Sequence, residues 1–183
     1  MAERHPRPRA TPFFYSSLFH RDLHKKQFSR RITLAGRLPL LLNSKIMITR
    51  ISHVTLFVLD QEKAREFYVD KLGFNVNTDV KMPNGFRWLT VNTPDQPDLE
   101  IALLNPLGDG MHYDDETKAA FKVLFEKGAL GAGVFNTPDC RATYEELTAK
   151  GVGFKGEPKE QFYGTEAILT DGLGNWFSMS QPK

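Results

Sequence analysis

The chain has 183 residues, of which 40% are hydrophobic and 25% charged, as is usual for a soluble globular protein. Residues 1–46 hold ten lysines and arginines and two acidic residues (+8), whereas residues 47–183 hold 14 basic and 20 acidic residues (−6). The basic charge therefore belongs to the N-terminal segment, and the body shows no bias toward nucleic acid. The single cysteine, Cys140, excludes an intramolecular disulfide framework and fits a reducing compartment.

Residues 1–46 show no sustained hydrophobic period, so we expect a disordered N-terminal extension. Their longest apolar run, 38–42, contains a proline and is too short to span a bilayer. The Arg-rich, acid-poor composition resembles an organelle transit peptide, which leaves organelle import as an alternative to a cytoplasmic location. Met47 resembles a natural chain start, so an upstream mis-start also explains the extension. A chain that begins at Met47 should then unfold at the same temperature as the full chain.

Residues 51–58 are predicted to form a β-strand, because two kinds of side chain alternate along them. One set is mostly aliphatic and suits a face that a helix covers. The other includes a histidine and a threonine and suits a face turned toward a cavity. The first set is Ser52, Val54, Leu56 and Val58, and the second is Ile51, His53, Thr55 and Phe57.

Two similar helices are predicted, one in each half of the body. Asp60 is the expected N-cap of an amphipathic helix that places Phe67 on its apolar face and ends before Gly73. Asp139, 79 positions later, precedes the second helix at 140–150. A repeat of this length indicates two tandem structural modules and not a solenoid.

Each module is expected to contain one strand before its helix and about three strands after it, which predicts an α+β fold of two βαβββ modules. A short helix at 117–127 is expected in the linker between the modules. The strands expected after the first helix are 74–80, 86–91 and 99–104, and those after the second are 152–154, 162–170 and 176–180.

Two such modules, with HVTLFVLD and FYVDKLGF in the first and DGLGNWF near the end, resemble the vicinal oxygen chelate superfamily. This group includes glyoxalase I, bleomycin- and fosfomycin-resistance proteins and extradiol dioxygenases. The resemblance covers residues 47–183 as one glyoxalase-like domain. It implies curled mixed sheets that form half-barrels around a site, with the helices outside. It does not define the reaction, because one fold hosts many functions.

Metal-dependent members of this superfamily take ligands from the first and fourth strands of each module, and in the first module these positions fall on His53 and Glu100. An imidazole and a carboxylate suit Zn²⁺, Ni²⁺, Mn²⁺ or Fe²⁺. The corresponding positions of the second module are Ala132 and Ser178, so the resemblance implies only two of four ligands. The ordinary structural explanation is that His53 is a hydrogen-bonded strand residue and that Glu100 is exposed on an edge strand.

Other side chains are weaker candidates for the site. Glu166 either faces the cavity, where it could shuttle a proton as Glu100 could, or faces solvent. His112 either reaches over the cavity from the linker or is an exposed loop histidine. Aromatic residues either fill the core or line a cavity that suits a small, partly apolar ligand. The residues expected to contact a ligand are Thr55, Phe57, Trp88, His112, Tyr163 and Trp176.

Three functions remain open from the sequence. The first is a metal-dependent glyoxalase- or lyase-type enzyme with His53 and Glu100 as metal ligands and Glu100 and Glu166 as catalytic residues. The second is a metal-free protein that sequesters a small molecule, as bleomycin-resistance proteins do. The third is a ring-cleaving dioxygenase, which needs two histidines and one carboxylate. In each case we expect a homodimer with a small-molecule ligand and no nucleic-acid or membrane partner.

Overall fold

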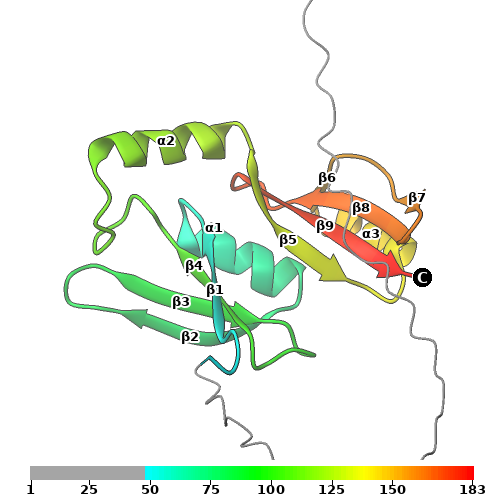
Figure 1. Ribbon diagram of the computed structural model, residues 1–183, viewed down its shortest axis with the longest axis horizontal. Coiled ribbons are helices and arrows are strands. Elements are labelled where there is room, and N and C mark those ends of the chain that lie inside the picture. Colours follow the sequence, from blue (N-terminus) through cyan, green and yellow to red (C-terminus); the bar gives the residue numbers. More distant parts are fainter. Residues whose placement is uncertain (1–47) are drawn as a thin grey trace, which may run out of the picture. The chain divides into compact units, whose positions relative to one another are not determined.

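Two mixed β-sheets, one from each module, are the framework of residues 48–183, which are the residues that the computed structural model describes (Figure 1). The first sheet has the order β1-β4-β3-β2, and the second has the order β5-β9-β8-β6 with β7 paired to β8. This arrangement confirms the predicted α+β fold of two βαβββ modules. The strands are β1 (His53–Phe57), β2 (Asn75–Lys81), β3 (Arg87–Asn92), β4 (Glu100–Leu104), β5 (Leu130–Asn136), β6 (Gly153–Phe154), β7 (Lys159–Gln161), β8 (Gly164–Thr170) and β9 (Asn175–Pro182).

The helices are α1 (Gln61–Arg65), which continues into the π-helical turn η1 (Glu66–Lys71), the linker helix α2 (Asp115–Glu126) and α3 (Cys140–Ala149). None of the described helices is long and apolar enough to cross a membrane. The expectations for residues 1–46 and for the chain start at Met47 concern residues outside the described part of the chain, so they stay predictions.

Both module helices begin at the predicted aspartate. The carboxylates of Asp60 and Asp139 each accept two backbone N–H groups of the first helical turn, all at 3.0 Å. The first helix then widens into η1, where the neighbouring residues Phe67 and Tyr68 are both buried. Periodicity alone predicts one regular helix here, whereas burial of two adjacent aromatic rings accompanies a π-helical turn.

One continuous hydrophobic core joins the helix-covered faces of the two sheets. Tyr68 of the first module packs edge-on against Phe177 of β9, and Phe74 packs against Phe135 of β5, with ring centroids 6.1 and 5.5 Å apart. Because these contacts cross from one module to the other, neither module buries its aromatic residues alone.

Two local predictions differ from the structure. Val54 belongs to the aliphatic set of β1, but it is 39% exposed because it lines an open groove between β1 and β5 and not a helix-covered surface. The strand predicted at 162–170 begins later, as β8 at Gly164, and Phe162 lies in the turn between β7 and β8 with 89% of its surface exposed. Gly164 follows this turn, where a Cβ atom would clash with the carbonyl oxygen of Gln181.

Phe67→Ala should destabilise the fold by about 3–5 kcal/mol, because it leaves a cavity where a ring is now 5% exposed. Chemical denaturation measures this difference directly. Glu66→Ala, at the exposed neighbouring position, is the matched control and should change stability by less than about 0.5 kcal/mol. A cost for Phe67→Ala below about 1 kcal/mol would show that this face of the helix does not pack as described.

Candidate functional site

The candidate site lies on the face of the first sheet that α1 does not cover. β1 pairs in parallel with β4, and the register sets His53 opposite Glu100. Both side chains therefore leave the sheet on the same face, with His53 Nε2 at 3.5 Å from Glu100 Oε2. The two side chains are 41% and 19% exposed, so a ligand can reach them from solvent.

Two hydroxyl groups hold this pair in place. Thr90 Oγ1, fully buried on β3, donates a 2.6 Å hydrogen bond to Glu100 Oε2. Ser52 Oγ lies 3.0 Å from His53 Nδ1 on the other side of the imidazole ring. The hydrogen bond from Thr90 is the main reason that the pKa of Glu100 is below its usual value, and Asn77 and His53 add to the effect. Glu100 is therefore an ionised acceptor at neutral pH.

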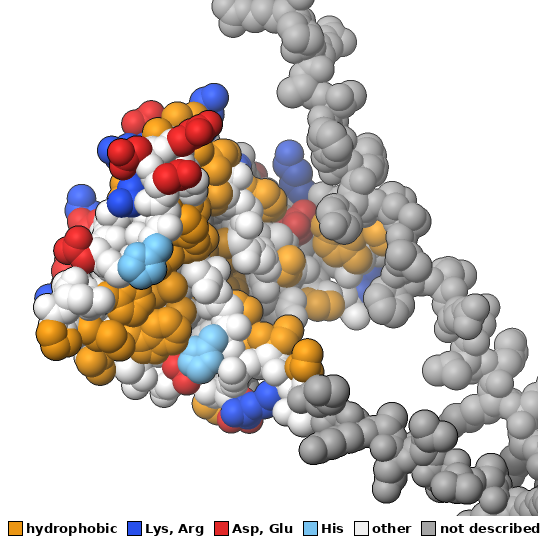
Figure 2. All heavy atoms as spheres, turned by 60° about the vertical axis from the view of Figure 1, so that its left-hand side comes forward, with side chains coloured by type: hydrophobic (Ala, Val, Ile, Leu, Met, Phe, Trp, Pro, Cys, Tyr) orange, Lys and Arg blue, Asp and Glu red, His pale blue; other side chains and the backbone are white. Residues whose placement is uncertain are grey.

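Aromatic side chains flank the pair. The Trp88 ring lies 5.8 Å from the His53 ring, and Phe86 follows at 6.3 Å from Trp88. At the other end of β1, Phe57 packs against Phe121 of α2 at 4.9 Å. Hydrophobic side chains gather beside the histidines in the space-filling view of this side (Figure 2). The face thus combines one charged acceptor with aromatic surface, as small-molecule sites do.

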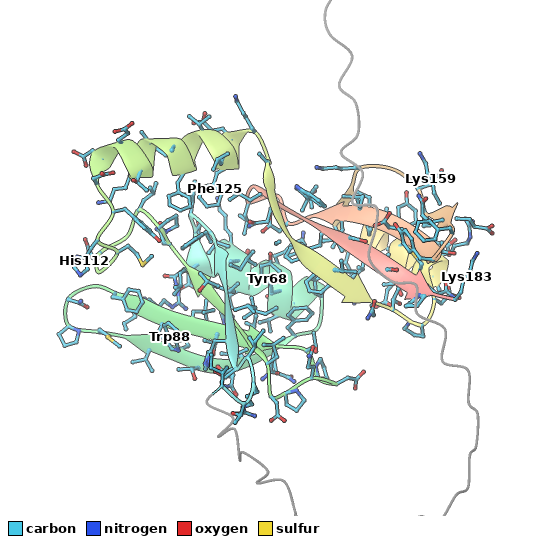
Figure 3. The ribbon with its side chains drawn as sticks, in the orientation of Figure 1. Tyr68, Trp88, His112, Phe125, Lys159 and Lys183 are labelled. Carbon is cyan, nitrogen blue, oxygen red and sulfur yellow. The ribbon has the colours of Figure 1, made fainter. Side chains whose placement is uncertain are left out.

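The remaining predicted site residues of the first module are dispersed. Thr55 shares the face of His53 but also borders the groove beside β1. His112 is an exposed residue in the loop before α2, on the same side of the molecule as Trp88 (Figure 3). No hydrogen bond or ion pair among residues 48–183 joins His112 to His53 or Glu100.

The predicted residues of the second module form a separate group. Glu166 on β8 accepts hydrogen bonds from Tyr163 Oη at 2.7 Å and from Ser178 Oγ. Burial and the hydrogen bond to Glu166 raise the pKa of Tyr163 to about 12. Trp176 lies under Lys155, whose Nζ is 5.2 Å from the ring centroid. In the described part of the chain no polar or ring contact links this group to the His53–Glu100 pair.

The residues fit only part of a metal site. Two ligands of a tetrahedral ion with bonds of about 2.1 Å lie roughly 3.4 Å apart, close to the 3.5 Å between His53 Nε2 and Glu100 Oε2. Across residues 48–183, however, no cluster of three or more histidine, cysteine, aspartate or glutamate side chains could hold an ion. Ser178 is buried and bonded to Glu166, and Ala132 carries no donor. One chain therefore offers two protein donors.

Comparison with known proteins identifies the family. The family model described as the Glyoxalase/Bleomycin resistance protein/Dioxygenase superfamily matches residues 50–179. The chain belongs to this superfamily. The match covers both modules, which confirms the predicted resemblance.

Several known proteins are similar to this chain over nearly their whole length. The uncharacterized protein YurT of Bacillus subtilis (strain 168) is 37% identical over 75% of this chain and 98% of its own. The crystal structure of UcmS2 shares 46% identity with a TM-score of 0.67, over 73% of this chain and 98% of UcmS2. TnmS3, an antibiotic binding protein from Streptomyces sp. CB03234, shares 28% identity with a TM-score of 0.58, over 75% and 99% of the two chains.

Sequence reasoning missed two residues that shape this face, Thr90 and Ser52, whereas Phe86 was among the aromatic residues expected in the core or the cavity wall. Thr90 belongs to an expected strand, but its partner depends on the β3–β4 register, which pairs Thr90 with Ala102. Ser52 was assigned to the aliphatic set, although its hydroxyl reaches the adjacent imidazole. A polar residue within an aliphatic set was the signal available for Ser52.

Thr90→Val should raise the pKa of Glu100 toward the ordinary value of about 4.3, because it removes the hydroxyl donor and nearly preserves side-chain shape. A lowered pKa stabilises the fold above the ordinary glutamate value, and this stabilisation is lost as pH falls through the lowered value. The variant should therefore lose more stability at pH 7 than at pH 3. An NMR titration of the Glu100 carboxyl and denaturation at both pH values measure these changes.

Thr55→Val is the matched control for this experiment. It changes a threonine on the same face whose hydroxyl makes no hydrogen bond to another described side chain. The control should leave the pKa of Glu100 unchanged. If Thr90→Val also leaves it unchanged, the hydrogen bond does not determine the ionisation of Glu100.

Proposed function

We propose that the protein binds a small, partly aromatic molecule on the open face of its first sheet and holds it without converting it. The observation that carries this proposal is the His53–Glu100 pair beside Trp88. One ionised acceptor, one imidazole and an indole ring lie together where solvent reaches them. A few well-placed polar groups beside an aromatic surface are typical of sites that orient a small ligand.

The chemistry of the face suggests which ligands fit. Glu100 accepts hydrogen bonds, so a ligand should present a hydroxyl or N–H group to it. Trp88 and Phe86 offer ring surface for a planar group. A phenolic aromatic compound satisfies both requirements. The relative TnmS3 is named an antibiotic binding protein, which supports ligand binding as the function of this fold.

The placement of Glu166 favours binding over catalysis. Both of its carboxylate oxygens already accept hydrogen bonds from Tyr163 and Ser178 within the second module. A proton shuttle must lie within hydrogen-bonding reach of the reacting group. Glu100 alone would have to perform this step.

The alternative is a metal-dependent enzyme of the lyase type. The 3.5 Å spacing of His53 Nε2 and Glu100 Oε2 favours it, because both atoms could share Zn²⁺, Ni²⁺, Mn²⁺ or Fe²⁺ with water ligands. An ion held by two protein ligands should bind weakly. The ring-cleaving dioxygenase has less support, since it requires a second histidine and His112 lies apart on its loop.

A homodimer is part of this proposal. β1 and β5 are edge strands, and the groove of about 250 Å³ between them is bordered by Val54 and by Val134, which is 64% exposed. A two-fold partner is the commonest way to cover such an edge and would enclose the open face. Light scattering should give the mass of two chains at micromolar concentration, and the mass of one chain would contradict the dimer.

Binding is tested by isothermal titration calorimetry with phenolic probes of increasing size, such as 1-naphthol and alizarin. His53→Ala and Trp88→Leu should each weaken binding about tenfold or more, because each removes a central contact. Lys122→Ala, on the exposed side of α2, is the control and should bind normally. Circular dichroism verifies that each variant is folded.

Mass spectrometry of the recovered probe then separates binding from catalysis. The proposal expects each bound probe to be recovered unchanged, with or without added Zn²⁺, Ni²⁺, Mn²⁺ or Fe²⁺. Metal-dependent conversion that fails in His53→Ala would establish the enzyme instead. Affinity that is equal in all variants would place the ligand elsewhere.

A further inference from the structure

A groove on the helix side of the molecule has no part in the function proposed above. Its volume is about 230 Å³, and it lies between the end of the first helix, the segment from β5 to α3, and α3 itself. The floor is apolar and consists of side chains that also belong to or pack against the hydrophobic core. These floor residues are Phe74, Phe135, Leu147, Leu169 and Met179.

Two lysines at equivalent positions of the two modules lie at the rim. Lys71 ends the first helix and Lys150 ends the second, 79 positions apart like the two aspartate N-caps. Lys71 Nζ donates to the carbonyl oxygen of Gly151 at 3.1 Å, which brings it across the groove to the residue after Lys150. The repeat therefore concentrates two ammonium groups beside one apolar floor.

These ammonium groups have donors to spare. Lys150 Nζ donates one hydrogen bond to a described residue, to Glu146 Oε1 at 2.7 Å. Lys71 Nζ likewise donates one, to the carbonyl oxygen of Gly151. An ammonium group has three donors, so two remain on each lysine. The hydrogen bond from Lys150 also lowers the pKa of Glu146. The rim thus carries two cations and one paired anion.

We propose that this groove is a second ligand site, for a small amphipathic carboxylate such as an aromatic or short-chain aliphatic acid. The hydrocarbon part would lie on the apolar floor, and the carboxylate would accept hydrogen bonds from Lys71 and Lys150. Its volume is below the roughly 300–1,000 Å³ of pockets for drug-sized ligands, which limits the ligand to a small acid. A second carboxylate on the ligand would lie near the negative charge of Glu146 and be repelled by it, so a ligand with one carboxylate fits better than one with two.

The test uses ¹⁵N-labelled full-length protein titrated with octanoate and benzoate. Saturable amide shifts are expected at residues 135–137 and 147–151 and not along β1 and β4. Octanol lacks the charge and acetate lacks the apolar part, so both should bind at least about tenfold more weakly. Trp88→Leu should leave octanoate binding unchanged, which separates this site from the open face of the first sheet.

Lys71→Met and Lys150→Met test the two cations directly. Each should weaken octanoate binding about tenfold, because each removes a charged hydrogen-bond donor but keeps a similar apolar chain. Lys122→Met, an exposed lysine of α2, is the matched control and should have no effect. Absence of saturable shifts would overturn the proposal, as would shifts confined to β1 and β4 or binding that neither lysine variant weakens.

Discussion

The described fold depends on a buried aspartate of the second module that accepts a hydrogen bond from a tyrosine of the first. Tyr68 Oη donates to Asp171 Oδ2 at 2.9 Å, and the Asn175 amide donates both to that oxygen at 2.7 Å and to the carbonyl oxygen of Phe57 at 3.0 Å. Burial and Asp171 raise the pKa of Tyr68, which keeps the phenol protonated as the donor. A buried polar group without a hydrogen-bond partner is costly, so this network fixes how the turn at 171–175 packs against β1.

The network and the aromatic contacts around it lie in the core that the two modules share on the helix side of the sheets. The opposite face of the first sheet takes no part in that core, so it can carry His53 and Glu100 without a penalty in packing. Phe57 connects the two regions, because its carbonyl oxygen belongs to the buried network while its ring lies on the open face against Phe121. The hydrophobic core and the face proposed to bind a ligand thus lie on opposite sides of the same strand.

Sequence periodicity and capping predicted most of the fold, because they depend on local contacts. The aspartates before both helices were predicted correctly and the structure places His53 and Glu100 on one face, whereas Ser52 and Val54 depart from the alternation predicted along β1. Contacts between distant residues were beyond this reasoning: Tyr68 and Asp171 are 103 positions apart, and Thr90 meets Glu100 only through strand register. The turn at Phe162 also escaped prediction, because an apolar residue at a strand position normally indicates burial.

We propose that the open face binds a ligand through His53, Glu100 and Trp88 without a tightly held metal. Metal analysis tests this most directly, on protein purified from cells supplied with zinc, nickel, manganese and iron. Two protein ligands hold an ion weakly, so we expect well under one metal per chain and the same low content in His53→Ala. One tightly bound metal per chain that disappears in His53→Ala would contradict it.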